Sequence, residues 1–249
     1  MKKLLLVGCL LLIAACQQAT QTPTPQLIPT ATLPPTPIPV TDTPAPTPTI
    51  EPSPTPFPRF FTNGFDSSFA GWSLLQSNSD IASQATVKDG FLSVEITSPF
   101  TWIYSISDAH DYADVRIDAQ FQNRAGSPAS MGLICRYSEE KGWFEFNIST
   151  DGTYNVLYGK WLAVGIADYL PIADGPSKLI QPSGATQQIG LVCSDAILSL
   201  FINETILRNL DVTRYELAEG KVGITVSSFE NVPVIAAFDW VTVSESPSP

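Results

Sequence analysis

The sequence predicts an all-β domain, and a two-sheet antiparallel jelly-roll sandwich is the economical solution for its length. From residue 60 to residue 243, short runs alternate apolar and polar side chains, which is the period of a half-buried strand. Turn residues such as Asp-Gly separate these runs. No long stretch shows an apolar stripe at the 3.6-residue helical period, and the nearest, 212–219, is short. About 190 residues follow position 58, enough for one good-sized core.

Nine runs carry the strand signal in chain order. They are 91–96, 113–121, 132–137, 143–148, 153–158, 188–193, 196–202, 221–226 and 235–243. Asp151-Gly152 and Ser194-Asp195 each separate two neighbouring runs and predict hairpins. The segment 166–184 has the pattern of a long irregular link. We expect the domain to span 59–243 and a disordered tail to follow over 244–249.

The first fifteen residues have the composition of a signal peptide. A basic start is followed by almost wholly apolar residues over 4–15, too few to cross a hydrocarbon core of about 30 Å at about 1.5 Å per residue. The segment ends in Leu-Ile-Ala-Ala-Cys16, which resembles the bacterial lipobox. That resemblance implies cleavage before Cys16, lipidation of Cys16 and an outward-facing, membrane-anchored protein. An ordinary secretory leader that contains a Cys is the alternative.

Residues 17–58 have the composition of a disordered Pro/Thr-rich tether. They contain 14 of the 22 prolines, 11 threonines and no glycine. Proline fixes φ and removes backbone donors, so neither helix nor sheet is expected. At about 3.1 Å per residue the fully extended tether would reach roughly 130 Å. Recruitment of a proline-binding partner or O-glycosylation are alternative uses of the repeat.

The charge, the single histidine and the cysteines limit which partners, metal sites and cross-links this domain can have. Residues 59–249 carry 11 basic and 22 acidic residues, so the domain has no attraction to phosphate backbones and nucleic acid is not expected as a partner. The single histidine, His110, excludes a multi-histidine metal site. Cys135 and Cys193 are the two cysteines that follow the leader and Cys16, and outside the cytoplasm a disulfide between them is the default. Two buried thiols are the alternative.

A series of short motifs resembles the concanavalin A-like lectin/glucanase superfamily, especially bacterial laminin-G-type and 3-keto-disaccharide hydrolase-like domains. The motifs, in order, are Phe65-Asp66 with Trp72, Asp89-Gly-Phe-Leu-Ser-Val94, Gly132-Leu-Ile-Cys-Arg-Tyr137, Trp143-Phe-Glu-Phe146, Asp151-Gly-Thr-Tyr154, Leu200-Phe-Ile-Asn203, Gly220-Lys-Val-Gly-Ile224 and Phe238-Asp-Trp-Val241. The resemblance covers residues 60–243. It implies two curved antiparallel sheets whose concave face often holds a saccharide.

The acid signature of that superfamily's glucanases is missing. No Glu-x-Asp-x-x-Glu occurs in this sequence. The nearest acid-bearing strand carries Asp114, Arg116 and Asp118 on one face, where Arg116 is expected to lower the pKa values of both acids rather than leave one protonated as a general acid. A solvated sheet face is the plainer interpretation of these three residues.

The polar link around His110 is expected to be a surface loop. Contact with a ligand, or ligation of a metal together with Asp108 or Asp111, is the alternative. Because laminin-G-like folds often carry calcium, the clustered aspartates of 108–114 make calcium a conceivable cofactor, although their spacing matches no defined calcium loop.

Strand alternation selects the binding candidates. If Phe144, Phe146 and Ile148 face the core, the side chains between them face outward, together with either Arg136 or Tyr137 of the preceding strand. An aromatic ring, a carboxylate, an amide and a guanidinium on adjacent strands suit a saccharide. Tyr158 and the link 166–184 are expected to wall the same face. The candidate ligand-binding residues are Arg116, Arg136, Trp143, Glu145, Asn147 and Trp161. The alternative is that the two tryptophans only cover an edge of the core.

Three functions fit these patterns. The first is a surface-anchored, non-catalytic carbohydrate-binding domain, which we expect. The second is a protein-adhesion or assembly domain of the cell envelope. The third is a sugar-cleaving enzyme, which the missing acid pair disfavours.

Overall fold

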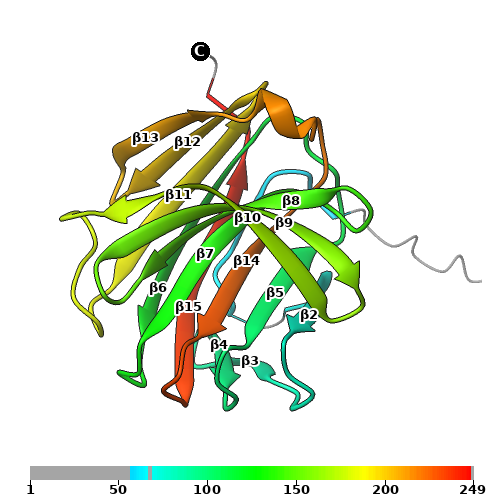
Figure 1. The fold of residues 1–249 in the computed structure, drawn as a ribbon. Helices are drawn as coiled ribbons and strands as arrows, with labels where there is room; N and C mark the ends of the chain where they lie inside the picture. Colours follow the sequence, from blue (N-terminus) through cyan, green and yellow to red (C-terminus); the bar gives the residue numbers. More distant parts are fainter. Residues whose placement is uncertain (1–56, 67–68, 248–249) are drawn as a thin grey trace, which may run out of the picture. The chain divides into compact units, whose positions relative to one another are not determined.

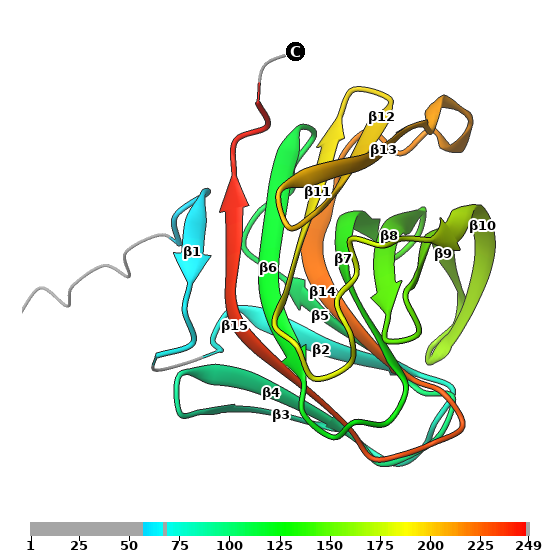
Figure 2. The ribbon, with the colours of Figure 1, turned by 90° about the vertical axis from the view of Figure 1, so that its left-hand side faces the viewer.

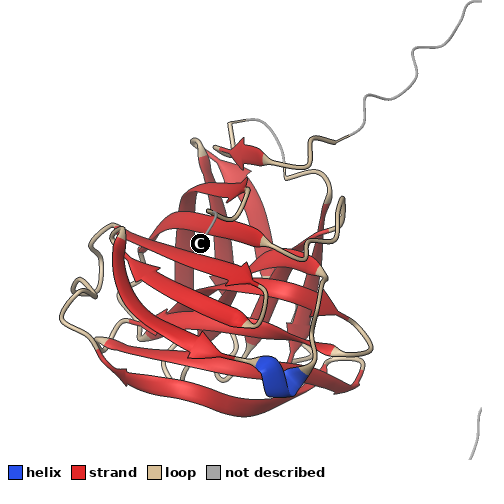
Figure 3. Ribbon diagram, turned by 90° about the horizontal axis from the view of Figure 1, so that it is seen from above, coloured by secondary structure: helices blue, strands red, loops and turns tan. Residues whose placement is uncertain are grey.

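The computed structural model describes residues 57–66 and 69–247, which form two antiparallel β-sheets packed face to face (Figure 1). The helical content of these residues is one 3-10 turn, η1 (Thr213–Tyr215), drawn in blue in Figure 3. The strands are β1 (Phe61–Asn63), β2 (Trp72–Ser77), β3 (Gln84–Lys88), β4 (Phe91–Ile96), β5 (Trp102–Ser107), β6 (Val115–Asn123), β7 (Ala129–Ser138), β8 (Gly142–Ser149), β9 (Thr153–Ala163), β10 (Ile166–Pro176), β11 (Gln187–Ser194), β12 (Ile197–Ile202), β13 (Thr205–Asp211), β14 (Lys221–Ser228) and β15 (Val234–Ser244).

The expected signal peptide, the lipidation site at Cys16 and the tether as far as residue 56 lie outside the described residues. Among the residues that are described, no helix has the length and apolarity needed to cross a membrane.

The order of the strands confirms the predicted two-sheet jelly-roll sandwich. The eight-stranded sheet runs β13-β12-β11-β6-β15-β4-β3, and β1 also pairs with β15. The seven-stranded sheet runs β10-β9-β8-β7-β14-β5-β2. Figure 2 separates the two layers, with β6 and β15 of one sheet set apart from β8, β9 and β10 of the other.

Alternation along the strands fills the core between the sheets. Phe144 and Phe146 of β8 point into it from the seven-stranded sheet and are fully buried. Four side chains of β6 fill it from the eight-stranded sheet, each no more than 1% exposed: Val115, Ile117, Ala119 and Phe121. Burial of apolar surface contributes about 25 cal/mol per Å², so this shared core is the main source of stability.

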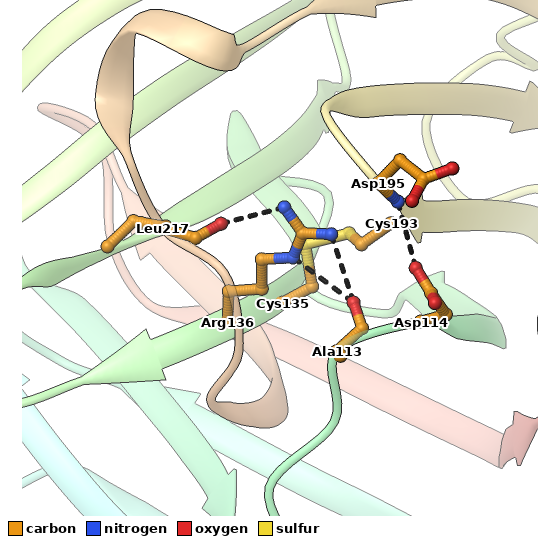
Figure 4. Close-up of a disulfide and its surroundings, with 7 residues drawn as sticks. All are labelled: Ala113, Asp114, Cys135, Arg136, Cys193, Asp195 and Leu217. Carbon is orange, nitrogen blue, oxygen red and sulfur yellow. Dashed lines mark hydrogen bonds between the residues drawn. A yellow bond between two sulfur atoms is a disulfide. The ribbon is translucent and has the colours of Figure 1, made fainter.

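Cys135 of β7 and Cys193 of β11 form the expected disulfide, which covalently joins the two sheets (Figure 4). Both cysteines are fully buried in the core. The alternative of two free thiols is therefore wrong.

The four strands that end the two sheets, namely β3, β13, β2 and β10, were all missed by the sequence pattern. β10 corrects the expectation of a long irregular link over 166–184, because Ile166–Pro176 is an eleven-residue strand paired with β9. Pro171 and Pro176 interrupt the strand pattern in the sequence, which is why this strand was not predicted. An edge strand tolerates proline because its free side has no ladder hydrogen bonds to lose.

We expect the disulfide to stabilise the domain by about 4 kcal/mol, because it closes a loop with a sequence separation of 58 residues. Residues 57–66 and 69–247 belong to one compact unit, Pro54–Pro249. The double substitution Cys135→Ala/Cys193→Ala should lower the free energy of unfolding of this unit by about that amount. Urea denaturation measures the difference. Dithiothreitol should destabilise the wild type and leave the variant unchanged, and a variant as stable as the oxidised wild type would contradict the expectation.

Candidate functional site

A second apolar cluster covers the outer face of the seven-stranded sheet, the face turned away from the core. Its six aromatic rings come from five different strands, β5, β7, β8, β9 and β10. Its buried members are Tyr104, Ile106, Ile134, Tyr137 and Trp143, and its half-buried members are Leu75, Trp102, Trp161, Ala167 and Tyr169.

Alternation along β8 placed three of the candidate ligand-binding residues on this face, as the sequence pattern predicted. The structure corrects their exposure, however. Trp143 is fully buried, Glu145 is 1% exposed and Asn147 is 4% exposed. None of the three is presented to solvent, so the expectation of an exposed Trp143 that stacks on a ligand is wrong.

The β9–β10 hairpin is the physical reason for this burial. Although β10 ends one edge of the sheet, the carbonyl of Gly165 in the hairpin turn accepts a hydrogen bond (3.2 Å) from the backbone N–H of Asn78, which follows β2 at the other edge. Figure 1 shows this turn beside β2. Trp161 and Tyr169 of the hairpin pack on Trp143 with ring centroids 5.2 and 6.1 Å away. The hairpin therefore occupies the face on which a ligand was expected.

Two glycines on the neighbouring strands leave room for the buried side chains. A Cβ atom at Gly159 would lie 2.4 Å from the ring of Trp143, and one at Gly132 would lie 2.0 Å from the Oδ1 atom of Asn147. Both distances are far below van der Waals contact, so larger residues at these positions would force the cluster apart.

Glu145 is enclosed at the centre of this cluster. Its carboxylate accepts hydrogen bonds from Nε1 of Trp143 (3.0 Å) and from Nδ2 of Asn147 (2.8 Å). Burial raises the pKa of Glu145, and these two donors partly offset the rise. Both carboxylate oxygens are thus engaged by neighbouring side chains, which is how a polar group is accommodated inside an apolar cluster.

Arg136 does not share this face. A register shift follows Cys135, and Arg136 itself has φ of 52°, which turns its side chain away from the cluster and leaves Tyr137 to join it. Arg136 is 2% exposed, and its guanidinium donates to the carbonyls of Leu217 (2.7 Å) and Ala113 (3.0 Å), beside the disulfide (Figure 4). Arg136 is therefore a structural residue, and Tyr137 is the one of the two alternatives that faces outward.

Arg116 belongs to the other sheet. It lies on β6 and forms a two-pronged ion pair with Asp118, with nitrogen–oxygen distances of 2.7 and 2.8 Å. Its guanidinium also lies 4.7 Å from the ring centre of Phe201. Tyr158, expected to wall the ligand face, instead packs against Phe144 and Tyr215 on the opposite side of β9. Neither Arg116 nor Tyr158 joins the other candidates.

An open groove, called here the side groove, runs along one flank of the covering hairpin. It consists of two adjoining depressions of about 370 and 360 Å³, which share Tyr137, Glu139 and Lys221. The first is lined mainly by Ser73, Leu74, Leu75, Gln76, Ile106, Asp108, Trp161, Val164 and Gly165, and the second by Asp111, Ser138, Lys141, Glu219 and Gly220. Each is within the size range of small-ligand sites, about 300 to 1,000 Å³.

Hydrogen bonds hold the polar wall of the side groove in place. Nζ of Lys221 lies 3.0 Å from Asp108, and the hydroxyl of Ser73 donates to the same carboxylate. Burial alone would raise the pKa of Asp108, but the donors Ser73 and Lys221 bring it below its usual value. On the aromatic wall, Nε1 of Trp161 donates to the hydroxyl of Tyr137 at 2.9 Å.

Of the six candidate residues, the side groove retains Trp161, while Glu145 and Asn147 lie buried on the same face of the sheet. Sequence reasoning missed Lys221, Glu139 and Ser73 as groove residues. Ser73 lies on an edge strand that the pattern did not reveal, and the other two stand at strand ends, where alternation gives no signal.

The polar link around His110 is a surface loop, as expected, and it contacts the first of the described residues. Nε2 of His110 lies 2.9 Å from the carbonyl oxygen of Phe57. The aspartates of this link have separate partners, since Asp108 pairs with Lys221 while Asp114 accepts from the N–H of Asp195. Across residues 57–66 and 69–247, no three His, Cys, Asp or Glu side chains are grouped so as to hold a metal ion.

Several solved structures have a fold similar to that of this chain. A Bacillus subtilis protein of unknown function with a galectin-like fold matches with a TM-score of 0.54 at 14% identity, covering 74% of this chain and 94% of its own. The carbohydrate-binding module CBM66 from Bacillus subtilis matches with a TM-score of 0.51 at 14% identity, covering 71% and 96%. A Bacillus licheniformis beta-glucanase matches with a TM-score of 0.54 at 11% identity, covering 75% and 98%.

At these identities the likeness shows the fold alone, a jelly roll of the concanavalin A-like type. No protein-family model and no curated protein matches the sequence.

The buried carboxyl of Glu145 should make stability depend on pH in a predictable direction. Because burial raises its folded-state pKa above the unfolded value of about 4.3, the folded chain binds this proton more tightly. The stability of the wild type relative to Glu145→Gln should therefore fall as the pH rises from about 4.3 to the folded-state pKa, and level off above it. Urea denaturation of both proteins between pH 4 and 8 measures this difference, in which other titrating groups cancel. A difference that does not change with pH would contradict the assignment.

Proposed function

We propose that this chain is a lipid-anchored protein of the cell envelope whose jelly-roll domain binds saccharides without cleaving them. The observation that carries the proposal is the side groove, which combines aromatic walls with fixed polar groups on the concanavalin A-like scaffold. The carbohydrate-binding module and the beta-glucanase among the structural neighbours support a saccharide as the ligand class.

The side groove offers both kinds of contact that sugars need. Trp161, which is half-buried, provides aromatic surface for the apolar face of a sugar ring, and the buried Tyr137 supports it by accepting a hydrogen bond from its Nε1. The carboxylate of Asp108 and the ammonium of Lys221 are fixed by their mutual ion pair and can accept from and donate to hydroxyl groups. A few fixed polar groups on an apolar wall are the usual composition of a small-molecule site.

Binding is favoured over hydrolysis by the position of the acids. Most glycosidases place two carboxyl groups about 5 to 9.5 Å apart on either side of the scissile bond. Glu145, on the outer face of the seven-stranded sheet, is enclosed beneath the hairpin with both oxygens accepting hydrogen bonds. A substrate has no access to it while the hairpin is closed.

A protein-adhesion domain is the second candidate, and the tip of the β9–β10 hairpin favours it. Leu162 is 68% exposed, Val164 is 99% exposed and Ile166 is 52% exposed. Neighbouring exposed aliphatic side chains of this kind are typical of contact surfaces for other macromolecules.

Anchoring rests on the sequence. The lipobox-like segment ending at Cys16 and the Pro/Thr-rich tether after it fit a domain that is held outside a membrane on an extended spacer.

The saccharide proposal is tested by a glycan array with the Pro54–Pro249 unit. We expect selective binding that weakens by about tenfold or more in Trp161→Ala, equivalent to about 1.4 kcal/mol. Val164→Arg should also block binding, with no loss of stability, because Val164 lines the groove yet is 99% exposed.

The matched control is Trp240→Ala. Trp240 lies on β15 of the other sheet, hydrogen-bonded to Gln120. Its removal should leave glycan binding intact. If no glycan binds at high protein concentration, the proposal fails and the protein-adhesion function takes its place.

Anchoring is tested in the full chain by metabolic labelling with a fatty-acid analogue in a bacterial host. We expect the wild type to be labelled and to fractionate with membranes, and Cys16→Ala to lose both properties. Cys9→Ala is the control, because Cys9 lies inside the apolar leader and should be removed with it. Equal labelling of the wild type and the Cys16 variant would refute lipidation at Cys16.

A further inference from the structure

We infer that the seven-stranded sheet carries an internal cross-linking site, at which the hydroxyl of Thr225 condenses with the side-chain amide of Asn147 to form an ester and release ammonia. Both residues lie on the outer face of the sheet, which the β9–β10 hairpin covers, and neither lines the side groove. The inference therefore does not depend on the saccharide function. It starts from a buried hydroxyl that has no hydrogen-bonding role among the described residues.

Thr225 supplies the nucleophile. On β14 its neighbours Ile224 and Val226 point into the core between the sheets, so Thr225 points to the outer face. Thr225 is 1% exposed, and within residues 57–66 and 69–247 its Oγ1 atom makes no hydrogen bond. A buried hydroxyl is normally hydrogen-bonded, because leaving it unpaired costs free energy. Its lone pairs are therefore free for attack on a neighbouring electrophile.

The register of the sheet brings the amide of Asn147 toward this hydroxyl. Gly132 of β7 pairs with Thr225 on one side and with Asn147 of β8 on the other, so the three residues form one row. A Cβ atom at Gly132 would lie 2.0 Å from Oδ1 and 2.9 Å from Cγ of Asn147. The amide carbon therefore takes the place that a side chain of residue 132 would occupy. From that place, directly opposite side chains on adjacent strands contact each other.

Glu145 supplies the proton transfer. Its Oε1 atom lies 2.8 Å from Nδ2 of Asn147, the nitrogen that has to leave. Burial raises the pKa of Glu145, and nearby donors, Thr225 among them, partly offset the rise, so the Thr225 hydroxyl is also close to this carboxyl. A carboxyl group with a raised pKa can both accept and return a proton near neutral pH. The same group thus serves the nucleophile and the leaving group.

The reaction balances without an oxidant or a cofactor. Oγ1 of Thr225 forms a bond to Cγ of Asn147 while its proton passes to the carboxylate of Glu145. The Cγ–Nδ2 bond then breaks, Glu145 returns the proton to Nδ2, and the nitrogen leaves as ammonia. The product is an ester between the two side chains, and Glu145 is a carboxylate again. Because Thr225 and Asn147 are no more than 4% exposed, water has little access to hydrolyse the ester.

The ester joins two strands that do not pair with each other. β8 and β14 both pair with β7 and flank it in the seven-stranded sheet. The disulfide ties β7 to β11 of the other sheet, whereas the ester ties the neighbours of β7 within one sheet. The two links together hold β7 and both of its neighbours against separation.

Peptide mass spectrometry of the full chain tests this inference. Trypsin cuts after Lys141, Lys160 and Lys221, so Asn147 and Thr225 fall in separate peptides, 142–160 and 222–249. After reduction and alkylation of the disulfide, we expect one linked species whose mass is the sum of these peptides less about 17 Da, the mass of ammonia. Mild alkali should cleave the link and leave peptide 142–160 about 1 Da heavier, because ester hydrolysis converts Asn147 to aspartate.

Variants identify the reacting groups. Thr225→Val keeps the shape of the side chain and should abolish the linked species, whereas Thr225→Ser keeps the hydroxyl and should retain it. Glu145→Gln should lower the linked fraction by about tenfold or more at equal times after synthesis. Ser227→Ala is the matched control, because Ser227 is the next outward-facing hydroxyl of β14 and is also buried. It should link as the wild type does. In every variant, formation of the Cys135–Cys193 disulfide reports that the domain has folded.

Three results would overturn the inference. The first is a wild type that yields the two peptides unlinked. The second is a loss of about 17 Da confined to peptide 142–160, which indicates attack on Asn147 by the backbone and not by Thr225. The third is a linked species that survives in folded Thr225→Val. A linked fraction that is unchanged in folded Glu145→Gln would overturn the role of Glu145. None of these results bears on saccharide binding, which the glycan array tests separately.

Discussion

The structure depends on the burial of both faces of the seven-stranded sheet. One face packs on the eight-stranded sheet, as in any sandwich, but the other is covered by the chain's own β9–β10 hairpin, which closes over Trp143. Every residue of β8 is buried in consequence. The aromatic surface of this outer face is therefore buried against the hairpin and is not available to a saccharide. Glu145 is tolerated on the same face because its neighbours donate hydrogen bonds to both of its oxygens.

Because the hairpin covers the outer face of the seven-stranded sheet, the surface that a ligand can reach lies elsewhere. The middle of the sheet is closed, and the open concavity lies along the flank of the hairpin, where Trp161 forms one wall and the ends of β5, β7 and β14 supply charged groups. Those strand ends are where the jelly roll allows most variation, because side chains there need not fit a packed layer. A shared fold with glucan-related proteins is therefore compatible with a different ligand and a different site.

The irregular step in β7 connects the core to this surface. After Cys135 is fixed by the disulfide, the left-handed residue Arg136 breaks the alternation, so that Tyr137 joins the outer cluster. Arg136 itself is turned to bind the carbonyls of Ala113 and Leu217. This irregularity in β7 therefore has two effects. It turns the side chain of Tyr137 toward the groove, and it lets Arg136 hold the segments at Ala113 and Leu217 beside the Cys135–Cys193 disulfide.

The sequence by itself determined the fold class, the disulfide and the inward face of the central strands, because these follow from local alternation and from the number of cysteines. It also placed Trp143, Glu145 and Asn147 together on one face of β8. Only the tertiary structure decided that this face is closed. The hairpin that closes it includes an edge strand interrupted by prolines, and its contacts with β2 join residues far apart in the chain. Strand periodicity shows which way a side chain points, but whether solvent reaches it depends on what the rest of the chain lays over it.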